Sequence, residues 1–126
     1  MKKLLTLPRI LLIVAAALIF CGGIPPHQHV SAQTETRNID LTAKRFNFDP
    51  SEITVKKGQP VKLTIKSLDT NHGLRVKELG IDMKIKKGST AEAEFTPDKT
   101  GDFVGHCTVF CGSGHGSMQL TIHVVE

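Results

Sequence analysis

The feature that most constrains the fold is a series of short runs in which apolar and polar residues alternate. In residues 61–65 Val, Leu and Ile alternate with Lys and Thr, and residues 120–125 repeat the pattern with Leu, Ile and Val. Successive side chains of a β-strand point to opposite faces, so this period of two indicates strands with one buried face. No run shows a convincing helical period. The chain is therefore predicted to be all-β.

Turn signals separate these runs, because Gly or Pro stands wherever the chain must reverse. Seven or eight short strands within residues 38–126 predict a β-sandwich. The expected strands are residues 39–43, 52–55, 61–65, 74–76, 83–85, 91–95, 101–106 and 120–125. The turns between them contain Asp49-Pro50, Lys57-Gly58, Lys87-Gly88, Pro97-Asp98 and Thr100-Gly101.

Residues 1–32 have the pattern of an export signal. Basic residues precede an apolar run at residues 10–20, and a polar stretch ends at Val30-Ser31-Ala32. We expect cleavage after Ala32 and delivery to the periplasm or the extracytoplasmic face. The chain would then divide into a signal peptide at 1–32, a linker at 33–37 and a folded domain at 38–126.

Two alternatives to cleavage stay open. Residues 10–20 could be retained as a membrane anchor, although a spanning helix needs about 20 apolar residues. Cys21 could carry a lipid, although the bulky Phe20 before it is a poor fit to that processing. Either alternative would leave the domain associated with a membrane.

The charge of the chain gives no reason to expect nucleic acid as a partner. The formal net charge is +4, but Lys2, Lys3 and Arg9 belong to the export signal, which leaves 13 basic against 12 acidic residues. Two lysine pairs, Lys56-Lys57 and Lys86-Lys87, are expected at solvated turns. Such pairs could also contribute to electrostatic docking of an acidic redox partner.

The segment at residues 105–118 concentrates metal-binding side chains. Cys107, Cys111, His115 and Met118 place two thiols, an imidazole and a thioether within a dozen residues. Thiolate and thioether select copper, and imidazole also suits it, whereas zinc has little use for a thioether. Three interspersed glycines would let the loop fold tightly enough for these side chains to converge.

A further ligand is expected from outside this segment. His72 follows the strand at 61–65 and is the leading candidate. His106 and His123 are expected on the other face of their strands, and His27 and His29 precede the expected cleavage site. None of these four is predicted as a ligand.

His72 followed by Cys-x-x-x-Cys-x-x-x-His-x-x-Met at residues 107–118 resembles the copper A domain of cytochrome c oxidase subunit II and of nitrous oxide reductase. The likeness extends over about residues 38–126 and implies a cupredoxin-like Greek-key β-sandwich with a binuclear copper centre. Within that resemblance Cys107 and Cys111 bridge two copper ions, His72 and His115 bind one copper each, and Met118 and the carbonyl of Val109 are axial ligands.

The resemblance also implies function. The chain would relay single electrons and perform no bond-making chemistry by itself, with a c-type cytochrome or a terminal oxidase as redox partner. Two departures bear on this: Val109 stands where the oxidase subunit usually has Glu, and the chain contains no Trp and no Tyr for an aromatic electron-entry patch.

Other interpretations of the same residues remain. Cys107 and Cys111 could form a disulfide in an oxidising compartment, or two Cys and two His could hold structural zinc. A Cu(I) carrier could use the same ligands without shuttling electrons. A mononuclear type 1 copper site could use His72, one Cys, His115 and Met118.

Overall fold

The computed structural model describes residues 34–126. These residues belong to one compact unit. The expected signal peptide with its cleavage after Ala32, the alternative anchor at 10–20, Cys21, His27 and His29 lie outside the described residues. Within the part that is described, no helix has the length and apolar character needed to cross a membrane.

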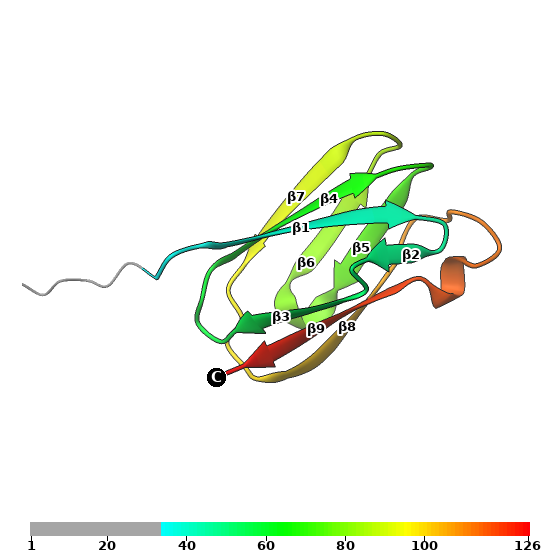
Figure 1. Ribbon diagram of the computed structural model, residues 1–126. Helices are drawn as coiled ribbons and strands as arrows, with labels where there is room; N and C mark the ends of the chain where they lie inside the picture. Colours follow the sequence, from blue (N-terminus) through cyan, green and yellow to red (C-terminus); the bar gives the residue numbers. More distant parts are fainter. Residues whose placement is uncertain (1–33) are drawn as a thin grey trace, which may run out of the picture. The chain divides into compact units, whose positions relative to one another are not determined.

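Within the described residues, nine strands form two sheets that pack face to face (Figure 1). The first sheet has the order β2-β1-β4-β7 and the second has the order β3-β9-β8-β5-β6. Two single-turn 3₁₀ helices complete the described elements, η1 (Lys77–Leu79) and η2 (His115–Ser117). The strands are β1 (Arg37–Lys44), β2 (Asn47–Asp49), β3 (Glu52–Lys56), β4 (Val61–Ser67), β5 (His72–Val76), β6 (Ile81–Ile85), β7 (Thr90–Phe95), β8 (Gly101–His106) and β9 (Gln119–Val125).

The alternation in the sequence becomes alternation in burial. In β4 and β9 every second residue is buried between the sheets, and Leu63 and Ile122 are fully enclosed. Burying such a side chain contributes about 1.5–3 kcal/mol relative to leaving it exposed, so these strands supply much of the folding free energy. The all-β prediction is confirmed, and each of the eight expected strands is present to within a few residues.

The ninth strand, β2, was not predicted. It has three residues, of which Phe48 alone is buried, so it is too short to show an alternating pattern. It pairs antiparallel with the end of β1, where Lys44 lies opposite Asn47. The turn between β1 and β2 therefore lies at the same end of the sandwich as the C-terminal end of β1.

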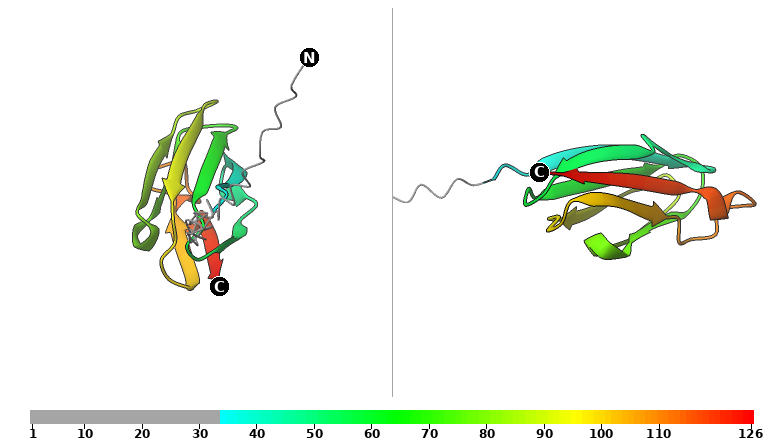
Figure 2. Two further views of the ribbon diagram at one scale, coloured as in Figure 1. Left: turned by 90° about the vertical axis from the view of Figure 1, so that its left-hand side faces the viewer. Right: turned by 90° about the horizontal axis from the view of Figure 1, so that it is seen from below.

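Four connections lie at that end (Figure 2). Together with the strand residues that flank them, they form what we call the loop end, defined as residues 44–47, 66–71, 84–89 and 107–118. Two backbone hydrogen bonds tie the second segment to its neighbours: Leu68 N–H donates to the carbonyl of Ala43, just before the first segment, and Ser67 N–H donates to the Ser89 carbonyl in the third. The longest of the four is the β8–β9 loop, residues 107–118, which contains most of the predicted ligands.

Candidate metal centre

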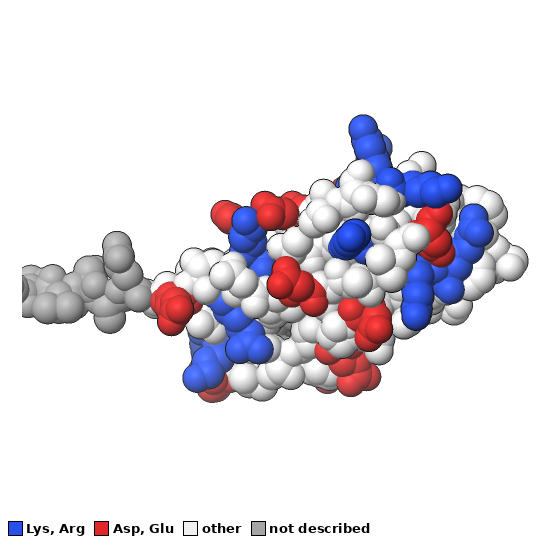
Figure 3. Space-filling model, turned by 45° about the horizontal axis from the view of Figure 1, so that its top comes forward, with Lys and Arg blue, Asp and Glu red and all other residues white. Residues whose placement is uncertain are grey.

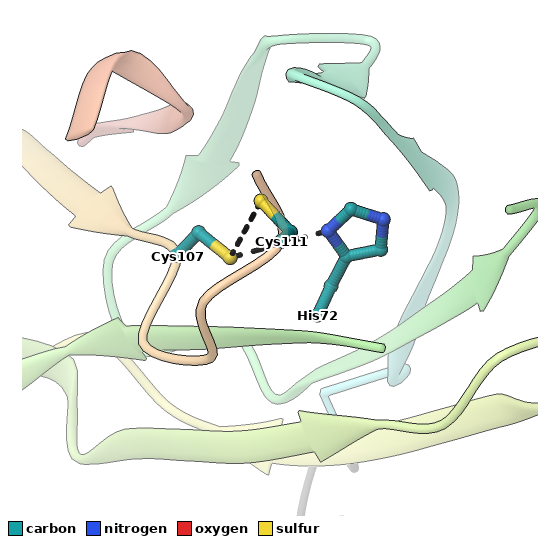
Figure 4. Close-up of side chains that lie close together, drawn as sticks. All are labelled: His72, Cys107 and Cys111. Atoms are coloured by element: carbon teal, nitrogen blue, oxygen red, sulfur yellow. Dashed lines mark hydrogen bonds between the residues drawn. The ribbon is translucent and has the colours of Figure 1, made fainter. Parts of the chain in front are cut away.

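His72 is the first residue of β5 and is completely buried at the loop end. Its Nε2 lies 2.8 Å from Asp69 Oδ1, and its Nδ1 lies 4.0 Å from Cys107 Sγ (Figure 4). With Nε2 donating to the carboxylate, Nδ1 keeps its lone pair and faces the thiol. A carboxylate that holds the outer nitrogen of a histidine in this way is the usual support for a metal-binding imidazole.

Cys107 and Cys111 both point into the same buried space (Figure 4). Cys107 directly follows β8, and its N–H donates to the Met118 carbonyl, which closes the base of the loop. The two Sγ atoms are 3.9 Å apart and both thiols are free. A disulfide needs about 2.05 Å between sulfurs, so in this conformation the thiols are reduced neighbours.

Burial, with the adjacent Cys107 as the second cause, raises the pKa of the Cys111 thiol to about 11. Removing a proton there would put negative charge into a poorly solvated space that a second sulfur already shares. The Cys111 thiol of the metal-free protein is consequently protonated at neutral pH. A metal ion that binds these sulfurs must displace protons, so its affinity should rise with pH.

The remaining predicted donors lie beside the thiols. The Val109 carbonyl oxygen is 3.3 Å from Cys107 Sγ, while His115 Nδ1 and Met118 Sδ are each 3.8 Å from Cys111 Sγ. Met118 is fully buried and His115, in η2, is half-buried. The structure thus brings all six predicted residues together, and the ligand atoms of His72, Cys107 and Cys111 lie within 4.8 Å of one another.

Two glycines let the β8–β9 loop lie against the β1–β2 turn. Gly112 has φ of +138°, which L side chains rarely adopt. A Cβ at Gly114 would lie 2.4 Å from the ring of Phe46, which covers this part of the loop. At Gly116, by contrast, a Cβ would meet nothing within 4 Å, so only the first two of the three glycines are needed for close packing.

Arg45, also in the β1–β2 turn, makes hydrogen bonds to two parts of the site. Its Nε donates to the Cys111 carbonyl at 2.7 Å, and its backbone N–H donates to Asp69 Oδ2 at 2.7 Å. Burial would raise the pKa of Asp69, but hydrogen bonds from His72, Arg45 N–H and Thr70 N–H outweigh it and hold that pKa below its usual value. Asp69 therefore stays ionised and keeps His72 oriented.

Arg45, Phe46 and Asp69 are the functional residues that the sequence analysis missed. Asp69 carried a signal, because it stands three residues before His72 and can reach back to the ring. Arg45 carried none, since 66 residues separate it from Cys111. His106 is exposed, and His123 binds Asp102 on the outer face of the sheet, so both lie away from the site as expected.

The donor set fits copper. Two sulfurs from thiols, one thioether sulfur, two imidazole nitrogens and one carbonyl oxygen form one continuous cluster of contacts. Soft sulfur ligands combined with imidazole are the set that copper prefers, and a buried thioether facing the cluster is a ligand for which zinc has little affinity.

The fold and the arrangement of this site define a class of protein. Residues 10–119 match the family described as the cupredoxin-like domain, so the chain belongs to that family. It is homologous to cytochrome c oxidase subunit II. It is 31% identical to "Cytochrome c oxidase subunit 2" of Thermus thermophilus over 86 residues, and this alignment covers 68% of this chain and 64% of the relative. The chain thus spans a little under two thirds of that relative's length.

Solved structures share the fold. The periplasmic domain of subunit II of the cytochrome oxidase of Bradyrhizobium japonicum superposes with a TM-score of 0.66 at 22% identity, covering 71% of this chain and 84% of that domain. Auracyanin A, a "blue" copper protein from Chloroflexus aurantiacus, superposes with a TM-score of 0.58 at 19% identity, covering 72% of this chain and all of that one. The predicted cupredoxin-like sandwich is confirmed.

Proposed function

We propose that this chain is an extracytoplasmic electron-transfer protein that holds two copper ions at its loop end. One observation carries the proposal: the donors form two matched sets. Cys107 has an imidazole nitrogen at 4.0 Å and a weak donor, the Val109 carbonyl, at 3.3 Å. Cys111 has an imidazole nitrogen and a weak donor, the Met118 thioether, each at 3.8 Å. The two thiols, 3.9 Å apart, lie between these sets.

A mononuclear site would use one thiol and leave the other as a spectator. Here each thiol has its own histidine, and both are nearly inaccessible to solvent. Two copper ions would use all six donors: the thiolates of Cys107 and Cys111 would be shared between the ions, His72 and His115 would each hold one ion, and Met118 and the Val109 carbonyl would be the weaker ligands. We therefore favour two ions over one.

Bound copper would supply one-electron chemistry between Cu(I) and Cu(II). The chain's own contribution is to exclude water and to fix the donors before metal arrives. Met118 and His72 are fully buried, Asp69 orients His72, and Arg45 anchors the Cys111 carbonyl. A site held this firmly changes little in geometry when its charge changes, which favours fast electron transfer.

Location and partners follow from the sequence and the relatives. Residues 1–32 have the pattern of an export signal, and one structural relative is described as a periplasmic domain. The chain would act in the periplasm or on the extracytoplasmic face, accepting electrons from a protein such as a c-type cytochrome or delivering them to a terminal oxidase. Bond-making catalysis would belong to another subunit. The mass of the exported protein would show whether cleavage follows Ala32.

The proposal is tested by counting copper and thiols. Purified protein is loaded with copper, desalted, and examined by native mass spectrometry together with the variants Cys107→Ser, Cys111→Ser and, as an exposed loop control, Ser113→Ala. We expect two copper ions per chain in the wild type and in the control, and loss of the pair in each Cys variant.

Three outcomes would contradict it. One copper ion that survives in one of the Cys variants would indicate a mononuclear type 1 site. Copper that is removed by mild chelation and never supports one-electron cycling would indicate a Cu(I) carrier. Zinc retained through purification at one ion per chain, with copper unable to replace it, would indicate a structural zinc site.

A further inference from the structure

Positive charge is concentrated at the loop end. The four segments that define it, residues 44–47, 66–71, 84–89 and 107–118, contain six Lys or Arg and a single acidic residue, Asp69. The rest of residues 34–126 contains seven Lys or Arg and eleven Asp or Glu. Figure 3 shows several Lys and Arg side chains around this end; a second group of basic side chains lies at the other end of the described domain, where acidic groups lie beside it. The nearly neutral domain is therefore polarised, with its positive pole at the candidate metal centre.

Most of these cations are not neutralised within the described residues. Among the described residues, the ion pairs that Lys or Arg makes with Asp or Glu lie away from the loop end: Lys57 with Glu126, Lys62 with Glu92 and Arg75 with Asp82. The single acid of the loop end, Asp69, is engaged with His72 and with the Arg45 backbone. The exposed cations at the loop end that take part in none of these ion pairs are Lys44, Lys66, Lys84, Lys86 and Lys87.

An apolar centre lies within this basic end. Phe110, between the two cysteines, is 78% exposed, and its ring centroid is 5.8 Å from that of His115. Leu68 is also exposed, at 53%. A mostly apolar hollow of about 210 Å³ reaches His72 and is lined by Val109 and Ile85, with Lys84 and Lys86 beside them. Packing of the sandwich does not require an exposed Phe110, so this aromatic side chain is available for contact.

We propose that the loop end is a docking surface for a redox protein whose own contact surface is acidic around an apolar centre. The inference rests on the proposed function, because it names the kind of partner that exchanges electrons with that site. Opposite charge steers the encounter and fixes its orientation. An exposed aromatic residue surrounded by polar groups is the usual anatomy of a transient protein interface. Docking there would bring the partner next to His115.

The chain supplies a matched pair of variants. Lys86-Lys87-Gly88 at the loop end and Lys56-Lys57-Gly58 at the opposite end are the same sequence in the same kind of turn. Each has a glycine at positive φ, +69° and +77°, and each is closed by a hydrogen bond to the carbonyl of its first lysine. Lys86→Glu/Lys87→Glu and Lys56→Glu/Lys57→Glu therefore change the net charge equally at opposite ends.

The test measures the second-order rates at which a reduced probe transfers one electron to the oxidised, copper-loaded protein, so that the probe is oxidised and the copper site is reduced. The two probes are an acidic [2Fe–2S] ferredoxin and a basic mitochondrial cytochrome c. At low ionic strength we expect the ferredoxin reaction to be fast and to slow as salt is added. Lys86→Glu/Lys87→Glu should slow it about tenfold or more, while Lys56→Glu/Lys57→Glu changes it less than twofold. The reaction with the basic cytochrome should instead become faster as salt is added, because like charges repel. Equal effects of the two pairs, or a ferredoxin reaction that becomes faster as salt is added, would overturn the proposal.

A second measurement separates this proposal from the proposed function. Metal-free protein labelled with ¹⁵N is titrated with the same ferredoxin, and shift changes should cluster at residues 84–89 and around Phe110. If the shift changes cluster there but the protein does not bind a pair of copper ions, the docking surface is upheld and the proposed copper function is refuted. If the protein binds a pair of copper ions but the shift changes do not cluster there, the proposed function is upheld and the docking surface is refuted. Binding to vesicles containing anionic phosphatidylglycerol but not to ferredoxin would overturn the docking proposal in favour of a membrane surface.

Discussion

The sandwich body and the loop end are stabilised in different ways. In the body, buried positions are apolar and alternate along each strand, so neighbouring residues in the sequence already specify which face is enclosed. At the loop end, buried positions include His72, two thiols and a thioether, and the contacts that hold them span 24 residues for Arg45 with Asp69 and 66 for Arg45 with Cys111. The body should therefore fold without metal, whereas the geometry of the loop end depends on bracing from distant turns.

Leu63→Ala tests the body and should have the largest effect on stability. Leu63 is fully buried in β4, and truncating such a side chain leaves a cavity. We expect the free energy of unfolding of the metal-free protein to fall by about 3 kcal/mol, measured by denaturant titration. The copper stoichiometry of the folded variant should not change. A loss of copper from fully folded Leu63→Ala would mean that the two regions are not separable.

Arg45→Met tests the bracing of the loop end. The substitution removes the hydrogen bond from Arg45 Nε to the Cys111 carbonyl and leaves the backbone bond to Asp69 in place. We expect copper affinity to fall about tenfold, which corresponds to about 1.4 kcal/mol, and the copper absorption spectrum to shift. The control is Lys44→Met, a substitution at the exposed neighbouring residue. Competition with a chelator measures the copper affinity of each variant, and Lys44→Met should have the wild-type affinity. Equal affinities in both variants would refute the bracing role.

Alkaline pH should destabilise the metal-free protein in part through Cys111. The Cys111 pKa is raised from 9.0 to about 11 in the folded state, so between these values the folded protein binds more protons than the unfolded chain. Stability is therefore fully present below pH 9 and declines as pH rises toward 11. Cys111→Ser should lose this part of the decline in a series of denaturant titrations. Parallel curves for the two proteins would contradict it.

His123 offers the smallest expected effect, on the outer face of the body. Hydrogen bonding to Asp102, with a further contribution from Glu52, raises the pKa of His123 above 6.5. The associated stabilisation is fully present below pH 6.5 and is lost as pH rises through the raised pKa. His123→Gln should flatten the dependence of the melting temperature on pH in this range and leave copper binding unaltered. An unchanged pH dependence would show that the Asp102 contact contributes nothing measurable.

These differences also explain what could be predicted from sequence. Alternation in β4 and β9 was visible because it is local, and the Cys, His and Met spacing in residues 107–118 was visible because these residues share one loop. The order of strands within the two sheets could not be predicted, since pairings such as β1 with β4 and β3 with β9 join segments far apart in the chain. The roles of Arg45 and Phe46 could not be predicted for the same reason, because they contact the β8–β9 loop only after the sheets assemble.

The most direct test of the central claim is electron paramagnetic resonance of the copper-loaded protein after one-electron oxidation. If Cys107 and Cys111 bridge two copper ions and His72 and His115 bind one ion each, the account predicts a hyperfine pattern from one unpaired electron shared equally by two copper nuclei. A hyperfine pattern from a single copper nucleus, at full copper loading, would contradict it.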